Sequence, residues 1–498
     1  MRQSAYRWHD FYLGLVMEQG KSTKDDKGKT QEGETPLRLN TDTYVDGGSN
    51  RSSNEDSVME LERRVGIIQL ELPLTTSVKG RRTKGVTAKG IPITRSMVWH
   101  AYKKVRKNKG SGGVDGKSLK TYSENLEDNL YKLWNRLTSG SYFPKAVKQV
   151  SIPKKDGSQR KLGIPTIDDR IAQQIIKDYL ESRFEREFHE NSYGYRPLKS
   201  AHQALEQVRQ NVRKQDWVID MDIKGFFDEV SHELLAKALK KHVSEKWVLM
   251  YIERWLESPI ETESKELVYR QGQGTPQGGV ISPLLANLFL HYVFDKWIEQ
   301  TYPNLMFVRY ADDIIVHCST KEESERVLAS IKSRMAVCQL RLHEGKTKIV
   351  FCKKFKRQSA SKTVKFDFLG YSFQPRPSST KGGRMFLGYD CAISQSSKNK
   401  IISEIKSTKF QRWTNRSIEE IAEFFNTKIQ GWINYYGKFR KHKLNSLFRI
   451  FEKLLIEWVR RRYKRLRKSY IKASKWFFRF KRNNVRLFVH WERGFRNV

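Results

Sequence analysis

The most restrictive feature of this sequence is a pair of adjacent aspartates, Asp312 and Asp313, between two short apolar runs. The runs, Met306 to Arg309 and Ile314 to His317, carry the β-branched and aromatic residues typical of strands. We therefore expect a strand, a tight turn and a second strand, with both carboxylates held at the tip. Carboxylates fixed in this way can bind the two divalent cations, about 3.5–4 Å apart, that phosphoryl transfer to a nucleotide uses.

A second run that carries carboxylates lies upstream. Val218 to Ile223 is rich in strand-forming residues and contains Asp220 and Asp222, and Asp228 follows it closely. An aspartate of this region could complete a three-carboxylate metal site with the downstream pair. Turn or capping roles are the alternative for all three.

The charge of the chain favours a polyanionic partner. Lys and Arg total 94 against 55 Asp and Glu, which gives a formal net charge of +39 over 498 residues. Nucleic acid is the first expectation, and anionic lipid or an unrelated excess of charge is the alternative. We find no apolar run long enough to span a bilayer, and Phe11 to Met17 lacks the features of a signal peptide. Four cysteines without Cys-x-x-Cys spacing favour a reduced, cytosolic location.

Composition divides the chain into four parts. Residues 1–57 are mostly polar, and we expect a disordered or unassigned extension. Residues 58–92 combine an amphipathic segment with a basic linker. Residues 93–375 mix helical patterns with short strand-like runs, which predicts an α+β domain. In residues 376–498 the strand signals fade and helical periodicity dominates, with aromatic and basic residues interleaved, which predicts a helical domain.

Seven sequence blocks in a fixed order resemble reverse transcriptases, most closely those encoded within group II introns. In chain order the blocks are Arg160 to Arg170, Ser192 to Pro197, Val218 to Asp228, Gly274 to Asn287, Tyr310 to Asp313, Leu342 to Lys348 and Phe368 to Tyr371. Gly431 to Gly437 resembles the thumb or maturase signature of the same proteins. The resemblance implies a right-hand polymerase fold, with fingers and an antiparallel palm sheet, followed by an α-helical thumb or maturase domain.

The resemblance also implies a metal site. Asp222 and Asp312 would be the principal ligands of two Mg²⁺ ions, for which Mn²⁺ can substitute, and Asp313 would complete the site. The backbone carbonyl of Ile223 would add one oxygen. The three aspartates are thus the expected catalytic residues, and the other carboxylates of the upstream run are expected to be structural.

Cationic residues of the fingers are expected to bind the incoming nucleotide. Arg160 and Lys161 would neutralise the triphosphate as charge develops in the transition state, with Lys154 as a less certain helper. Exposure to solvent without a ligand is the alternative for such residues.

One ring and one glycine turn complete the expected nucleotide site. Phe227 lies five residues after Asp222, where related polymerases place a ring under the sugar. A ring at that position would exclude the 2′-hydroxyl of a ribonucleotide, and an ordinary core position is the alternative. Gln277 and Gly278 are expected to contact the nucleotide or the template backbone, because glycine allows close approach.

Positive charge also gathers in the helical part of the chain. The residues expected to bind RNA phosphates are Lys438, Arg440, Lys441, Arg460, Arg461 and Arg462. A solvated helix face is the alternative. The resemblance implies that this domain clamps intron RNA through its shape and its phosphates. No Cys pair or His-rich nuclease pattern follows Trp491, so second-strand cutting is not expected.

The sequence therefore predicts an RNA-directed DNA polymerase that extends a primer with dNTPs on an RNA template and assists intron splicing and retrohoming. The expected partners are template RNA, intron RNA and a DNA primer or target DNA, with no membrane; the family allows a homodimer. The expected location is the bacterial cytosol or nucleoid, and an organellar origin stays open. The alternatives are a domesticated reverse transcriptase in phage defence or CRISPR-associated acquisition, a splicing factor with a vestigial polymerase site, and an RNA-directed RNA polymerase.

Overall fold

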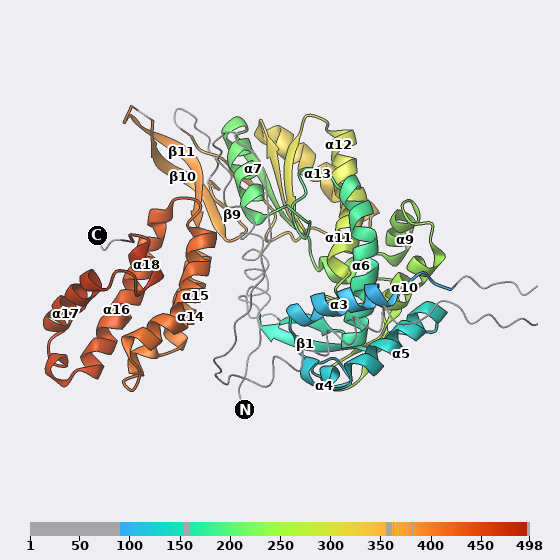
Figure 1. Ribbon diagram of the computed structural model, residues 1–498. Helices are drawn as coiled ribbons and strands as arrows, with labels where there is room; N and C mark the ends of the chain where they lie inside the picture. Colours follow the sequence, from blue (N-terminus) through green and yellow to red (C-terminus); the bar gives the residue numbers. More distant parts are fainter. Residues whose placement is uncertain (1–89, 154–158, 355–360, 362, 381, 496–498) are drawn as a thin grey trace, which may run out of the picture.

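The computed structural model describes residues 90–495 apart from 154–158, 355–360, 362 and 381 (Figure 1). The expectations for residues 1–57 and for most of residues 58–92 therefore lie outside the described residues. Among the helices of the described part, none is long and apolar enough to cross a bilayer.

The first region combines helices with a small sheet in the strand order β2-β1-β4-β5. Its helices are α3 (Arg95–Lys107), α4 (Leu119–Glu124), α5 (Leu126–Ser139), α6 (Ile167–Glu187), α9 (His232–Lys240) and α10 (Lys246–Glu257). Its strands are β1 (Val147–Pro153), β2 (Gln159–Ile164), β4 (Ile260–Glu261) and β5 (Leu267–Val268). The Thr166 side chain caps α6 by accepting a hydrogen bond from the Asp169 amide. Because buried residues lie on every side of its N-terminal half, α6 is a core helix.

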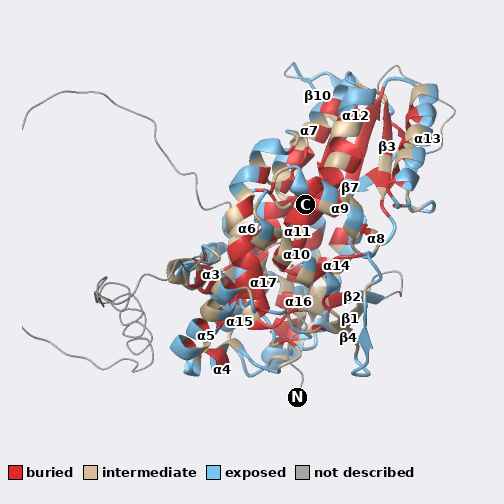
Figure 2. Ribbon diagram, turned by 90° about the vertical axis from the view of Figure 1, so that its right-hand side faces the viewer, coloured by how far each residue is buried: buried red, intermediate tan, exposed pale blue. Residues whose placement is uncertain are grey.

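A second, antiparallel sheet in the order β6-β7-β3-β8 lies beside these helices. Its strands are β3 (Trp217–Asp222), β6 (Met306–Tyr310), β7 (Asp313–Cys318) and β8 (Lys348–Phe351). The helices around it are α7 (Ala201–Lys214), α8 (Phe226–Glu229), α11 (Ser282–Leu290), the π-helical turn η1 (His291–Asp295), α12 (Lys296–Thr301) and α13 (Lys321–Val337). The strands are buried on both faces (Figure 2), and successive residues of β3 enter two different cores. Ile219 packs in the core shared with the first region, and Val218 packs in a core shared with the C-terminal helices.

The C-terminal region begins with a three-stranded sheet, β9 (Phe366–Phe368), β10 (Tyr371–Ser379) and β11 (Met385–Ile393). The expectation that strand structure fades beyond residue 376 is therefore wrong for residues 376–393. The hairpin turns at Gly382 and Gly383, and Gly383 adopts a φ of 81° that favours glycine. This pair of glycines was the sequence signal for a second strand.

Helices follow the hairpin (Figure 1). They are α14 (Gln395–Ser407), α15 (Ile418–Tyr436), α16 (Asn445–Arg462), α17 (Tyr470–Asn483) and α18 (Val489–Glu492), with short 3₁₀ turns between them. Trp432 and Phe451 of these helices lie in the same core as Val218 and Val308 of the antiparallel sheet. The sheet and the C-terminal helices thus share one hydrophobic core.

Leu198 is a strained and exposed residue ahead of α7. Its φ is 61°, and 94% of its surface is accessible. A leucine in the left-handed region costs energy that glycine avoids, so we expect Leu198→Gly to raise the free energy of unfolding by about 0.5–1 kcal/mol. Urea denaturation measures this change. Leu267→Gly is the matched control: Leu267 is 50% exposed in strand β5, where glycine should lower stability. A lower stability of Leu198→Gly would show that the leucine side chain contributes to the fold.

Candidate active site

The predicted strand, turn and strand around the paired aspartates are confirmed. β6 and β7 pair in antiparallel fashion up to Tyr310 and Asp313, and the chain reverses through Ala311 and Asp312. Ala311 makes this tight reversal with a φ of 56°. Asp222, the last residue of β3, is the direct cross-strand neighbour of Asp313. Three carboxylates from two distant sequence runs therefore gather at one end of the sheet.

The backbone carbonyl of Ile223, the residue after Asp222, is directed toward the side of the sheet where these carboxylates lie. Ile223 forms a bridge with Leu342, flanked by hydrogen bonds from the His343 amide to the Asp222 carbonyl (2.7 Å) and from the Lys224 amide to the Arg341 carbonyl (2.8 Å). In a pair of this kind the central residues direct their own amides and carbonyls away from each other. The Ile223 carbonyl therefore faces the side of β3 on which β7 begins.

The carboxylates repel one another in surroundings of poor hydration. Burial raises the pKa of Asp312, and repulsion by Asp222 adds to the rise. Although Asp313 is exposed at the start of β7, the protein crowded around it raises the pKa of its carboxyl well above 3.8, with further contributions from Asp312 and Asp222. A bound cation would relieve this repulsion.

One cation of the protein already lies at this point. The Lys346 Nζ is 3.2 Å from the Asp222 Oδ2. Within the described ranges, no three His, Cys, Asp or Glu side chains are arranged around one point suited to a metal. The available donors are carboxylate and carbonyl oxygens, the type that Mg²⁺ and Mn²⁺ prefer. The residues therefore fit a divalent cation in donor chemistry, with Lys346 compensating part of the charge.

Asp220 has a partner of its own. It lies two residues before Asp222 on the same face of β3, 3.5 Å from the Lys348 Nζ. Burial raises the pKa of Asp220 to about 6, and Lys348 opposes the rise. Asp228 lies in the short helix α8.

The structure brings Arg160 of β2 into the electrostatic range of the carboxylates. Its positive charge opposes the rise that burial causes in the pKa of Asp312 and of Asp313. Lys161 is exposed on the same strand, and because neighbouring strand residues point to opposite faces, it projects from the other side of β2. Lys154 lies outside the described residues.

Sequence reasoning assigned no role to Tyr195, which the structure places in this group. Burial raises its pKa most, followed by the charge of Asp312, and Arg160 opposes the rise. Tyr195 has a φ of 56°, which the sequence does not predict because residues other than glycine rarely adopt a positive φ. The only sequence signal was its place in the block from Ser192 to Pro197.

Phe227 and its neighbour Phe226 differ in exposure. Phe226 is buried in the core at 3% exposure, and the two rings meet edge to face at 5.4 Å. Phe227 is only half-buried, and its carbonyl accepts a hydrogen bond of 2.7 Å from the Thr275 amide. This bond ties Phe227 to the loop that carries Gln277 and Gly278.

The Gln277–Gly278 turn packs directly on strand β2. The Gly163 amide donates to the Gln277 carbonyl at 2.7 Å. A Cβ on Gly278 would lie 2.2 Å from the Gly163 carbonyl oxygen, and the φ of Gly278 is 117°. Both the space and the backbone therefore require glycine. The loop that carries this turn is thus bonded both to β2, the strand of Arg160, and to Phe227.

Two protein-family models match this chain in sequence. The model "Reverse transcriptase (RNA-dependent DNA polymerase)" matches residues 152–373, and "Group II intron, maturase-specific domain" matches residues 398–476. Protein YkfC of Escherichia coli is 31% identical over 275 residues, which cover 48% of this chain and 71% of YkfC. The chain belongs to the reverse transcriptase family of group II intron proteins. The expected polymerase fold with a helical C-terminal region is confirmed.

Two relatives of this reverse transcriptase carry the intron in their names. The group II intron-encoded protein LtrA of Lactococcus lactis is 33% identical over 204 residues, covering 40% of this chain and 33% of LtrA. The putative COX1/OXI3 intron 1 protein of Saccharomyces cerevisiae is 30% identical over 252 residues, covering 51% of this chain and 29% of that protein. The match thus spans about a third of these two relatives.

The basic residues of the reverse transcriptase's C-terminal region have different surroundings. Lys438 and Arg461 are exposed. The exposed Arg462 donates to the Thr414 carbonyl, and Arg460 donates to the Arg467 carbonyl at 3.1 Å. Their RNA contacts stay predictions.

Arg440 and Lys441 are held by other parts of the protein. Arg440 donates to Asp390 at 2.7 Å, to the Pro377 carbonyl at 3.1 Å and to the Ser378 hydroxyl at 2.8 Å, and only 18% of its side chain is exposed. The Lys441 Nζ donates to a backbone carbonyl near the C-terminal end. The structure therefore gives Arg440 a role in joining the β10–β11 hairpin to the end of α15.

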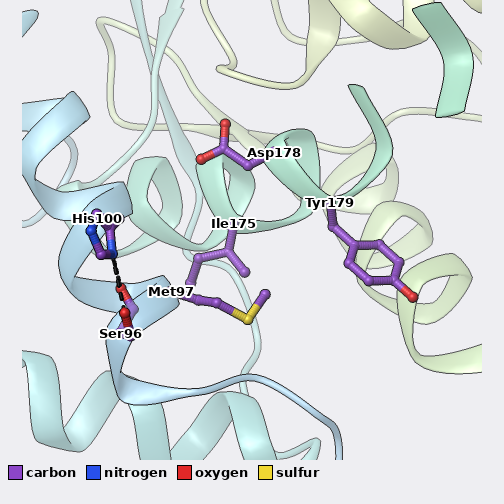
Figure 3. Close-up of a pocket in the computed structure, with 6 residues that line it drawn as sticks. All are labelled: Ser96, Met97, His100, Ile175, Asp178 and Tyr179. Carbon is purple, nitrogen blue, oxygen red and sulfur yellow. Dashed lines mark hydrogen bonds between the residues drawn. The ribbon is translucent and has the colours of Figure 1, made fainter. Parts of the chain in front are cut away.

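A separate hollow lies between α3 and α6 (Figure 3). It has a volume of about 250 Å³ and is lined by Ser96, Met97, His100, Ile175, Asp178 and Tyr179. None of these is a predicted site residue, so the hollow is distinct from the carboxylate site.

Proposed function

We propose that this reverse transcriptase extends a DNA primer on an RNA template and that Asp222, Asp312 and Asp313 hold the two Mg²⁺ ions of the reaction. The observation that carries the proposal is the cross-strand pairing of Asp222 with Asp313, with Asp312 in the adjoining turn. Divalent cations at such a site activate the attacking 3′-hydroxyl and stabilise the leaving pyrophosphate.

The remaining residues would bind and select the nucleotide. Arg160 is the proposed triphosphate contact, because its charge already acts on the carboxylates. The partly exposed ring of Phe227 would lie against the sugar and leave no room for a 2′-hydroxyl. The Gln277–Gly278 turn would approach the nucleotide or template, and the hydrogen bond from the Gly163 amide to the Gln277 carbonyl would hold it in place.

Primer extension tests the proposal. The purified protein is supplied with an RNA template, a DNA primer, Mg²⁺ or Mn²⁺, and either dNTPs or rNTPs. We expect extension with dNTPs only. Extension with rNTPs alone would identify an RNA-directed RNA polymerase, and no extension under any condition would favour a splicing factor with a vestigial site.

The C-terminal region supports a second role. A reverse transcriptase with a maturase-specific region binds nucleic acid. We propose intron RNA as the partner, with template RNA and a DNA primer or target DNA bound at the polymerase site. This region favours an origin in a group II intron over a domesticated role in phage defence or CRISPR-associated acquisition. A homodimer and the cytosolic location stay predictions.

Replacing Arg460, Arg461 and Arg462 together by Gln should weaken RNA binding. Each phosphate contact releases counterions from the RNA when the protein binds. The loss of one contact should therefore flatten the slope of log affinity against log salt by about 0.7–0.9. Filter binding over a salt series measures the slope. A matched control neutralises the exposed Lys321, Arg326 and Lys332 of α13, a helix that also carries three glutamates in its first two turns, and should leave the slope nearly unchanged. Equal slopes in both variants would return the arginines to a solvated face.

A further inference from the structure

A fully buried ion pair lies behind the turn that carries Asp312. Arg309 is the second-last residue of β6. It donates from Nε to the Asp295 Oδ1 at 2.7 Å and from Nη2 to Oδ2 at 2.5 Å. Both side chains are 0% exposed. Although burial alone would raise it, Arg309 holds the pKa of Asp295 below 3.8. The two parallel bonds fix the guanidinium plane in one orientation.

The third nitrogen of this guanidinium reaches the turn itself. Arg309 Nη1 donates to the Ala311 carbonyl at 3.2 Å and to the Asn287 Oδ1 at 2.9 Å. Ala311 is the left-handed residue directly before Asp312. A left-handed alanine is strained, so its conformation persists only where the surroundings hold it.

Asn287 connects the ion pair to a second wall of the turn. Its Nδ2 donates to the Gly194 carbonyl at 2.7 Å, and Asn287 is 1% exposed. A Cβ on Gly194 would lie 2.4 Å from the Ala311 amide nitrogen, so the Gly194 backbone lies against the turn. Ala311 is thus enclosed between Gly194 and Arg309, and Asn287 holds both.

The π-helical turn explains how one helix supplies both Asn287 and Asp295. These residues are eight positions apart on the continuous α11, η1 and α12. In a regular α-helix that spacing separates two side chains by ~80° around the axis. A π turn accommodates one extra residue, which reduces the separation to ~20°. Both side chains can therefore face Arg309.

We propose that Arg309, Asn287 and Asp295 are positioning residues that hold Ala311 in its left-handed conformation and thereby aim the Asp312 carboxylate. We call these three residues the turn frame. The inference rests on the proposed function, because it assigns the frame to the carboxylate that would hold the cation. The frame acts through Ala311 and does not touch the substrate.

Asn287→Ala tests the frame with the Arg309–Asp295 ion pair intact. We expect the affinity for Mn²⁺ alone, measured by electron paramagnetic resonance of the free ion, to fall at least several-fold. We expect kcat to fall by about 10–100-fold, because displacement of a catalytic group by about 1 Å costs rate on this scale. The KM for dNTP should change little, since Arg160, Phe227 and the Gln277–Gly278 turn are untouched.

Asn211→Ala is the matched control. Asn211 is a buried asparagine on α7, 2% exposed. Its side chain accepts a hydrogen bond of 2.9 Å from Gln207 of the same helix, and this bond does not involve the turn around Ala311. Its replacement should lower the melting temperature to a similar degree and leave Mn²⁺ affinity and kcat unchanged. If Asn287→Ala does not fold, Asn287→Ser tests the same link, because serine is too short to reach both Arg309 and Gly194.

The outcomes separate the frame from the proposed function. Equal Mn²⁺ affinity and kcat in the Asn287→Ala and Asn211→Ala variants would overturn the frame. Absence of primer extension by the unaltered protein would overturn the proposed function, and the Mn²⁺ titration would then decide the frame by itself.

Discussion

Replacing Asp312 by asparagine should abolish DNA synthesis and leave RNA affinity unchanged. The amide keeps the shape of the side chain but removes the charge that binds a cation, and a loss of several kcal/mol in transition-state stabilisation lowers the rate by about 10³-fold or more. RNA binding should survive, because it depends on the basic surface and not on the carboxylates. Primer extension and filter binding on the same preparation measure both quantities.

Asp128→Asn is the control for this substitution. Asp128 is exposed on α5 and pairs only at the surface with Lys132, so its replacement should change neither quantity. Joint loss of DNA synthesis and RNA binding in Asp312→Asn would show that the turn supports the whole fold, and the proposed division of labour would be wrong.

Replacing Phe227 by valine should admit ribonucleotides. The smaller side chain would leave room for a 2′-hydroxyl, and a steric difference of about 1–3 kcal/mol corresponds to a 10–200-fold change in discrimination. The ratio of kcat/KM for an rNTP to that for the matching dNTP measures it.

The adjacent phenylalanine provides the control. Phe226→Val removes a similar volume from the core, where Phe226 is 3% exposed, and should lower stability without changing sugar selection. If the ratio for Phe227→Val equals that of the unaltered protein, Phe227 is not the steric gate.

The carboxylate hairpin could be predicted because its signal is local. The runs on both sides of Asp312 and Asp313 are apolar and β-branched, and their pairing needs only one tight turn. Asp222 could be joined to this pair only through the family resemblance, since nothing in the spacing of two runs ninety residues apart states that they are neighbours.

Other features depend on contacts that leave no local pattern. The partner of Arg440 is Asp390, fifty positions upstream, and a charge run alone does not distinguish a buried arginine from an exposed one. The π-helical turn has no periodicity that separates it from an α-helix over five residues. The second strand of the β10–β11 hairpin is a different case: its outer half is exposed and does not alternate, so its local signal was limited to the glycine pair at the turn before it.

The shared core has a consequence for how this protein can change over time. The face of the antiparallel sheet with Val218 and Val308 packs in one core with Trp432 and Phe451 of the C-terminal helices. Deleting the sheet would expose these apolar side chains, whereas substituting a carboxylate at its end would not. A lineage kept only for its hold on RNA would therefore lose the aspartates by point substitution long before it could discard the domain that carries them.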